Sequence, residues 1–118
     1  MIILHCLRKD TWEAIKDLPV FGEESIAAEG FVHCSSIEYF WRVAPNFRDL
    51  ADELVLLCVD TEKLTSQVKW EDGDNTGRRY PHIYGPVNLD AVVAVLPYRK
   101  DKEGNYIKNE EFAHIPDR

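Results

Sequence analysis

One stretch of the chain limits the possible folds more than any other: ELVLLCVD, residues 53–60, is apolar at six consecutive positions. An apolar run of strand length without alternation is typical of a central strand that is covered on both faces. Other elements therefore have to lie on both sides of it. The 118 residues suffice for one ordinary hydrophobic core. Since no internal repeat or linker is present, we expect a single domain over residues 1–118.

The remaining segments predict short elements whose order along the chain indicates the fold class. Helices are expected early: one opened by Asp10 and Glu13, one or two turns over 25–29, and one from the Ser35-x-x-Glu38 capping box to Pro45. Strands are expected over 2–7, 31–34, 53–60, 66–71 and 89–98, with a hairpin turn over 100–106. Helices early and strands late predict an α+β domain rather than a regular βαβ alternation. Residues 107–118 are expected to be a weakly ordered tail.

Composition and charge argue against several classes of function. The net charge of −7, with scattered basic residues, argues against a nucleic-acid binder, which needs a clustered basic face. No apolar run is long enough to span a membrane, and the N-terminus lacks the residue order of a secretory signal. Three cysteines without a CxxC spacing do not make a disulfide framework. We therefore expect a cytoplasmic protein without a nucleic-acid or membrane partner.

The dipeptide His-Cys occurs twice, each time in a predicted strand: His5-Cys6 and His33-Cys34. Successive side chains on a strand point to opposite faces. If the two strands are neighbours, both histidines share one face and both cysteines share the other. Free cysteines are among the most buried residues, so we interpret these two, with Cys58, as core residues.

Together with His82 in the segment YPHIYGP, these histidines allow three interpretations. They could be hydrogen-bonded imidazoles without a ligand. They could hold zinc with an open fourth position, but they lie far apart in sequence and show no HxH, HxxxH or HExxH spacing, so no metal is expected. Imidazoles could also orient sugar hydroxyls or polarise a carbonyl group, beside an aromatic ring such as Tyr84 that stacks on a heterocycle.

Other polar residues are candidates for the same site. Glu71 is a candidate general acid or base, although a solvated loop carboxylate is the simpler interpretation. Arg78 and Arg79 are candidate phosphate clamps or a solvated pair. Ser35 would cap a helix whose free N–H groups would face an anion bound beside His33.

Several segments, taken in order, resemble one protein family: LHC near the N-terminus, Trp12 on the first helix, AAEGFVHCS, DELVLLCVD, Trp70-Glu71 and YPHIYGPVNLDAVVAV. GFVHCS and PHIYGP are specific when they occur together. On these segments, which cover about residues 1–98, the chain resembles the family catalogued as domain of unknown function 952. That family has no established biochemical activity.

The resemblance implies a fold similar to the ADP-ribosyltransferase group, in which a bent, mostly antiparallel, split β-sheet holds NAD in a cleft. In one branch of that group a first-strand His holds the NAD ribose, a Tyr stacks on the nicotinamide, and a late-strand Glu stabilises the oxocarbenium-like transition state. His5 matches the first of these positions, and Ser35 stands where the group often has Ser or Tyr. The late strand departs from the pattern because LDAVVAV offers Asp90 and no Glu. Glu71 is the only Glu in that neighbourhood.

These observations lead to one main hypothesis and two alternatives. The main hypothesis is a domain that binds NAD or another ADP-ribose-type nucleotide, with transfer or hydrolysis at the ribose C1 as the reaction it would catalyse. The catalytic candidates are His5, His33 and Glu71, and the ligand-binding candidates are Ser35, His82, Tyr84 and Arg79. The alternatives are a non-catalytic protein-interaction domain and a zinc hydrolase with histidine ligands.

Overall fold

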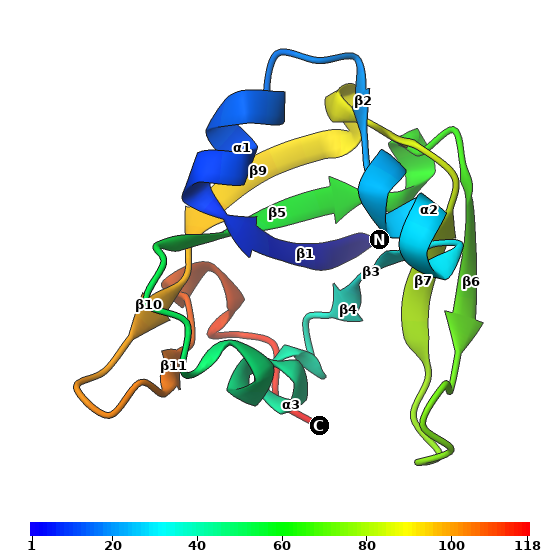
Figure 1. Ribbon diagram of the computed structural model, residues 1–118. Helices are drawn as coiled ribbons and strands as arrows, with labels where there is room; N and C mark the ends of the chain where they lie inside the picture. The colour runs from blue at the N-terminus through cyan, green and yellow to red at the C-terminus, as the bar shows by residue number, and fades with distance from the viewer.

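The apolar run predicted as a central strand forms β5 (Leu54–Asp60) in the computed structural model, which describes residues 1–118 (Figure 1). β5 lies between β1 (Ile2–Arg8) and β9 (Val92–Pro97) and pairs with both in antiparallel orientation. The two-residue strand β4 (Ser35–Ser36) completes a sheet with the order β4-β1-β5-β9. Every residue of β5 except Asp60 is buried, which confirms the prediction of a strand covered on both faces.

A second, three-stranded sheet has the order β3-β7-β6, and its strands are β3 (Val32–His33), β7 (Tyr80–Tyr84) and β6 (Gln67–Glu71). Two-stranded pairs are formed by β2 (Val20–Phe21) with β8 (Val87–Asn88) and by β10 (Arg99–Lys100) with β11 (Tyr106–Ile107). All strand pairs are antiparallel. In Figure 1, β6 and β7 run along the side of the molecule opposite the β10–β11 hairpin.

Three α-helices and four 3₁₀ helices accompany the sheets: α1 (Lys9–Ile15), α2 (Glu23–Glu29), α3 (Phe40–Val43), η1 (Ala44–Phe47), η2 (Thr61–Lys63), η3 (Leu89–Ala91) and η4 (Glu110–Phe112). None of the helices has the length and apolar character needed to cross a membrane. The predicted α+β class is confirmed.

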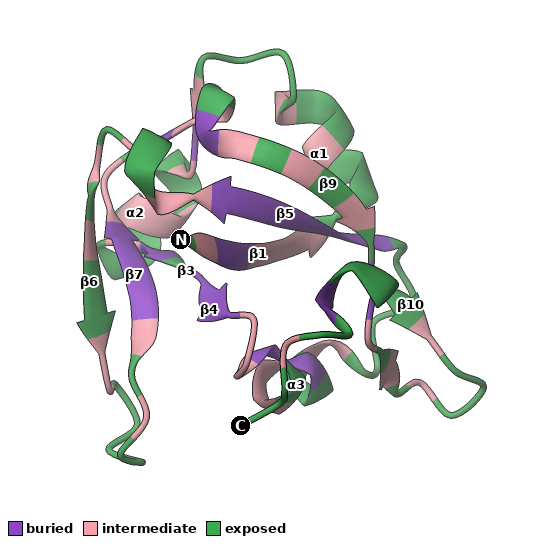
Figure 2. Cartoon of the chain, turned by 180° about the vertical axis from the view of Figure 1, so that it is seen from behind, coloured by how far each residue is buried: buried purple, intermediate pink, exposed green.

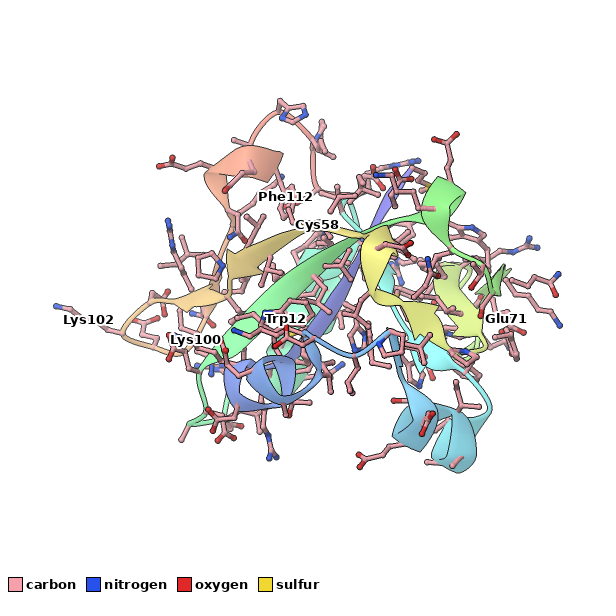
Figure 3. All side chains as sticks on the ribbon, turned by 90° about the horizontal axis from the view of Figure 1, so that it is seen from above. Trp12, Cys58, Glu71, Lys100, Lys102 and Phe112 are labelled. Carbon is pink, nitrogen blue, oxygen red and sulfur yellow. The ribbon has the colours of Figure 1, made fainter.

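Alternate residues of β5 face two separate hydrophobic cores. Leu57 packs in the first core, with Val32 and Ile83 of the second sheet. Leu56 packs in the second core, with Phe40 of α3 and Phe112 of η4. Figure 2 shows the buried residues concentrated on β5, β7 and β4, and Figure 3 shows Trp12 and Phe112 on opposite sides of the central sheet. A strand that alternates between two cores needs no polar face, which explains its uniform apolar sequence.

Of the strand predicted over 31–34, only Val32 and His33 form a strand, which belongs to the second sheet, and the chain enters the first sheet after it, at Ser35. His33 pairs with His82 of β7, while Ser35 pairs with Leu4 of β1. Between them, the Cys34 N–H donates to the carbonyl of Pro81 at 3.1 Å. The assumed pairing of 2–7 with 31–34, and the shared face that it implied for the histidines, are therefore wrong. Cys34 packs in the first core and Cys6 lies against the second, so the cysteines do not share a face either.

The helix predicted from the Ser35-x-x-Glu38 capping box begins later, at Phe40. Ser35 and Ser36 belong to β4 because they pair with β1, and only Ser36 approaches a capping role, through its Oγ, which accepts from the Tyr39 N–H at 3.3 Å. The predicted turns over 25–29 are confirmed by α2, which ends at Gly30 in the left-handed conformation, with φ +88°.

The C-terminal segment, for which weak order was expected, contains η4 and contributes to the second core. Phe112 and Asn109 are buried, and the Asn109 side chain donates to the Pro97 carbonyl at 2.8 Å. The N–H of Arg118 donates to the Glu38 carbonyl at 3.0 Å.

Candidate functional site

A pocket of about 590 Å³ opens beside the edge of β1. Its size is typical of a small-molecule site. β1 and the β3–β4 segment supply one part of the lining, α2 a second, and α3 with η1 a third. The lining residues are Leu4, His5, Cys6, Glu24, Ser25, Ala28, Glu29, His33, Cys34, Ser35, Phe40, Val43, Asn46 and Phe47. Three of the predicted site residues, His5, His33 and Ser35, therefore line one pocket.

The pocket exists beside β1 because β4 is short. β4 pairs with β1 only at Ile3 and Leu4, whereas β5 pairs with the whole of β1. Beyond Leu4, one edge of β1 has no partner strand, and main-chain polar groups on such an edge are available to a ligand. His5 and Cys6 are the lining residues on this unpaired part.

His5 is held in one tautomer by the backbone of the neighbouring segment. Its Nδ1 lies 2.7 Å from the carbonyl oxygen of His33. Because a carbonyl oxygen only accepts, Nδ1 carries the hydrogen. Burial lowers the pKa of His5, against a smaller opposing effect of this hydrogen bond. The ring is therefore neutral at pH 7, and its Nε2, which has no hydrogen-bond partner in the protein, is an unprotonated acceptor.

Ser35 and His33 differ from His5 in what they can offer a ligand. Ser35 is buried, and its hydroxyl donates to the Ser36 carbonyl at 2.8 Å, so toward a ligand it can only accept. The His33 side chain is 59% exposed, and its Nε2 contacts the carboxylate of Glu29 in a salt bridge at the end of α2. His33 therefore lies at the exposed rim of the pocket, and Ser35 lies in its buried wall.

A second group of predicted residues lies on the outer face of the three-stranded sheet. Glu71 Oε1 accepts hydrogen bonds from the Tyr84 hydroxyl at 2.5 Å and from His82 Nδ1 at 2.9 Å. His82 lies opposite His33 in the β3–β7 register, with 5.1 Å between the ring centroids. This cluster thus begins beside the pocket, but none of its three members lines it. The sequence assigned no element to the YPHIYGP segment, whose residues His82 and Tyr84 belong to β7, the central strand of the three-stranded sheet.

The hydrogen bonds fix the ionisation of this cluster. The Tyr84 hydroxyl, and to a smaller extent His82, lower the pKa of Glu71, and the same Tyr84–Glu71 bond raises the pKa of Tyr84. Glu71 is therefore an ionised carboxylate at neutral pH and Tyr84 is a neutral phenol. A carboxylate in this state can stabilise positive charge, but it cannot serve as a general acid.

Arg79, a predicted ligand-binding residue, also lies outside the pocket, and the zinc alternative finds no set of ligands. Arg79 is exposed at the end of the 72–79 loop and makes no hydrogen bond or ion pair. No group of three or more His, Cys, Asp or Glu side chains is arranged so that it could hold a metal ion. The zinc-hydrolase alternative therefore has no ligand set on which to rest.

The core interpretation of the three cysteines is confirmed. Cys34 and Cys58 are buried and Cys6 is half-buried, and all three are free thiols. Burial raises the pKa of Cys6 to about 12 and that of Cys58 to about 11. Thiols of this kind are poor nucleophiles at neutral pH.

Two residues that contact the candidate site residues were not predicted from the sequence: Phe31 and Glu29. The Phe31 ring stacks on His82 at 4.1 Å and meets the edge of His33 at 4.7 Å. The alternation of Phe31 with His33, matched by that of His82 with Tyr84, would have indicated one aromatic face if the β3–β7 pairing had been known. Glu29 lies four residues before His33, but the two meet across a left-handed glycine rather than on one helix.

The geometry can be compared with known proteins. A family model described as "Protein of unknown function (DUF952)" matches residues 6–95. Protein CC0527 from Caulobacter crescentus is 32% identical to this chain in sequence, and its crystal structure has a TM-score of 0.81 against this structure. The match covers 96% of this chain and 99% of that chain. Its solution NMR structure, also 32% identical, has a TM-score of 0.74, with coverage of 97% and 96%. No curated protein matches the chain.

Proposed function

The chain belongs to the DUF952 family of proteins of unknown function, and we propose that it binds an NAD- or ADP-ribose-type nucleotide in the pocket beside His5. The observation that carries the proposal is the fixed state of His5. Its Nδ1–H is committed to the His33 carbonyl, so the unprotonated Nε2 is the one hydrogen-bonding group of the ring that a ligand in the pocket could use. Such an acceptor suits the hydroxyl groups of a ribose, which are donors.

The lining also indicates which part of the nucleotide enters. No Lys or Arg is among the lining residues, so a pyrophosphate inside the pocket would find no cationic partner. Phe40, Val43 and Phe47 offer apolar surface for a flat ring, and the unpaired edge of β1 offers main-chain groups. The nucleoside half would occupy the pocket while the phosphates remain on the solvent side.

The proposal is restricted to binding because Glu71 does not line the pocket. In a reaction at the ribose C1, Glu71 would serve as the ionised carboxylate that stabilises an oxocarbenium-like charge, as its lowered pKa indicates. The reacting carbon would then have to lie past His33, on the outer face beside Tyr84.

The test is calorimetric titration of the protein with NAD and with ADP-ribose, repeated on His5→Asn. The Asn amide nitrogen can donate to the His33 carbonyl as Nδ1 does, whereas the Nε2 acceptor is lost. We expect saturable binding that weakens about three- to tenfold in His5→Asn, which corresponds to one hydrogen bond. His114→Ala, a change of an exposed histidine in the C-terminal segment, is the matched control and should bind like the wild type.

Two outcomes would contradict the proposal: no saturable heat with millimolar concentrations of either nucleotide, or equal affinity of wild type and His5→Asn. The first would leave the protein-interaction domain as the better hypothesis. The second would move any bound nucleotide to another surface of the molecule.

A further inference from the structure

We infer that the pocket selects a ligand whose inserted end carries positive charge, and that Glu24 and Glu29 make this selection. For the proposed nucleotide this means preference for the oxidised nicotinamide, a pyridinium cation, over the neutral reduced ring. The inference rests on the proposed function for its ligand but on a different set of residues for its argument.

The two carboxylates reach the pocket because α2 turns one face toward it. Four residues of α2 line the pocket: Glu24, Ser25, Ala28 and Glu29. They occupy positions i, i+1, i+4 and i+5, which lie on one face of a helix. Glu23, one residue earlier, is exposed and does not line it. The helix thus separates three nearby glutamates into two that face the pocket and one that does not.

The lining holds two carboxylates, and only one of them has a partner among the lining side chains. Glu24 forms no salt bridge, and the only partner of Glu29 is the side chain of His33, itself a lining residue. The other polar lining residues, His5, Ser35 and Asn46, are uncharged at pH 7 and therefore do not offset the carboxylates. A ligand that inserts an anion would therefore meet repulsion, and one that inserts a cation would meet attraction.

The aromatic part of the lining favours the same class of ligand. Phe40 and Phe47 come from α3 and η1, outside the acidic helix. Carboxylates combined with aromatic rings are a common arrangement for organic cations, since the ring faces attract positive charge and cover apolar surface. A flat pyridinium ring carries the positive charge and also covers apolar surface, whereas the neutral reduced nicotinamide only covers apolar surface.

The expected size of the preference for a cationic ligand follows from the strength of exposed charge pairs. Each such pair contributes roughly 0.2–1 kcal/mol, and two pairs together correspond to about a tenfold difference in affinity. This preference is measured with two ligand pairs in which the charge changes while the carboxamide-bearing ring is kept. One pair is NAD in its oxidised and reduced forms. The other is ring-N-methylated nicotinamide, a cation, and nicotinamide, which is neutral; neither of these carries a phosphate.

The experiment is calorimetric titration of wild type, the double variant Glu24→Gln/Glu29→Gln, and the control Glu23→Gln with all four ligands. We expect about tenfold preference for the cation of each pair in wild type and Glu23→Gln, falling to less than about threefold in the double variant. Because both Glu23 and Glu24 lie in the first turn of α2, the control also corrects for the loss of helix-end charge. Thermal unfolding of each variant verifies that the fold is retained.

Each outcome separates this inference from the proposed function. Equal affinity for oxidised and reduced NAD would overturn the charge selection while leaving nucleotide binding intact. Binding of the methylated ring without binding of NAD would support the charge selection and reject the nucleotide. If none of the four ligands binds, the charge selection fails, and nucleotide binding fails with it unless ADP-ribose binds in the first titration.

Discussion

At the scale of single residues, Glu71 shows how a side chain's ionisation depends on its donors. Its carboxylate accepts from the Tyr84 hydroxyl and from His82, and Tyr84 has the larger effect on its lowered pKa. We expect Tyr84→Phe to raise the pKa of Glu71 toward the ordinary value of about 4.3, measured by NMR titration of the Glu71 carboxyl carbon. Tyr80→Phe is the control, because Tyr80 lies opposite Glu71 in the strand register but does not donate to it. An unchanged pKa in Tyr84→Phe would show that this hydrogen bond is not formed in solution.

The lowered pKa of Glu71 predicts that the stability of the fold depends on pH. The pKa of Glu71 is lower in the folded than in the unfolded chain, so the unfolded chain binds the proton first as the pH falls. The stabilisation by Glu71 is therefore complete above the unfolded value of about 4.3 and is lost as the pH falls through the lower folded value. Urea unfolding at a series of acidic pH values should show a steeper loss of stability in wild type than in Glu71→Gln.

At the scale of elements, the position of α2 depends on the glycines at its two ends. Gly22 has φ +103°, and a Cβ there would approach Val32 Cγ2 of β3 to 2.7 Å. Gly30 has φ +88°, but a Cβ there would meet nothing within 4 Å. The first glycine is required both by the backbone and by the close packing of α2 on β3, and the second by the backbone alone.

We therefore expect Gly22→Ala to destabilise the protein by about 2–3 kcal/mol, and Gly30→Ala by about 1 kcal/mol, since only the former adds a steric overlap to the left-handed strain. Urea unfolding measures both changes. Equal losses in the free energy of unfolding would mean that α2 can shift away from β3 with little energetic cost, so that the steric overlap is relieved. Because α2 carries part of the pocket wall, Gly22→Ala should also weaken binding of the proposed nucleotide.

At the scale of the whole molecule, the second core is closed by the end of the chain. Phe112 of η4 packs with Leu56 of β5 and Phe40 of α3, three residues that are widely separated in sequence. We expect Phe112→Ala to reduce the free energy of unfolding by about 3 kcal/mol, measured by urea unfolding. His114→Ala, two residues later and exposed, should change it by less than about 0.5 kcal/mol. A loss for Phe112→Ala as small as the control's would support the weakly ordered tail that the sequence predicted.

The elements with a strong local pattern could be predicted from the sequence. The apolar run that became β5 required cover on both faces, and the glycine at the end of α2 marked its stop. The turn between β10 and β11 was also expected, and it carries Gly104 at φ +86°. The α+β class followed from the order of such elements. Each of these features depends on residues close together in the chain, where periodicity and turn chemistry act directly.

The arrangement of the candidate site was decided by tertiary structure alone. Strands of two residues, such as β3 and β4, carry no periodicity, and their partners lie 31 residues or more away in sequence. Local pattern therefore could not show that the chain changes sheets at Cys34, that the His33 carbonyl fixes the tautomer of His5, or that Phe31 covers His82. The sequence by itself determined which residue types could form a site, the histidines, Ser35, Glu71 and Tyr84. Only long-range pairing decided that His5, His33 and Ser35 share a pocket while Glu71, His82 and Tyr84 form a separate cluster, because the free energy of strand pairing depends on partners distant in the chain.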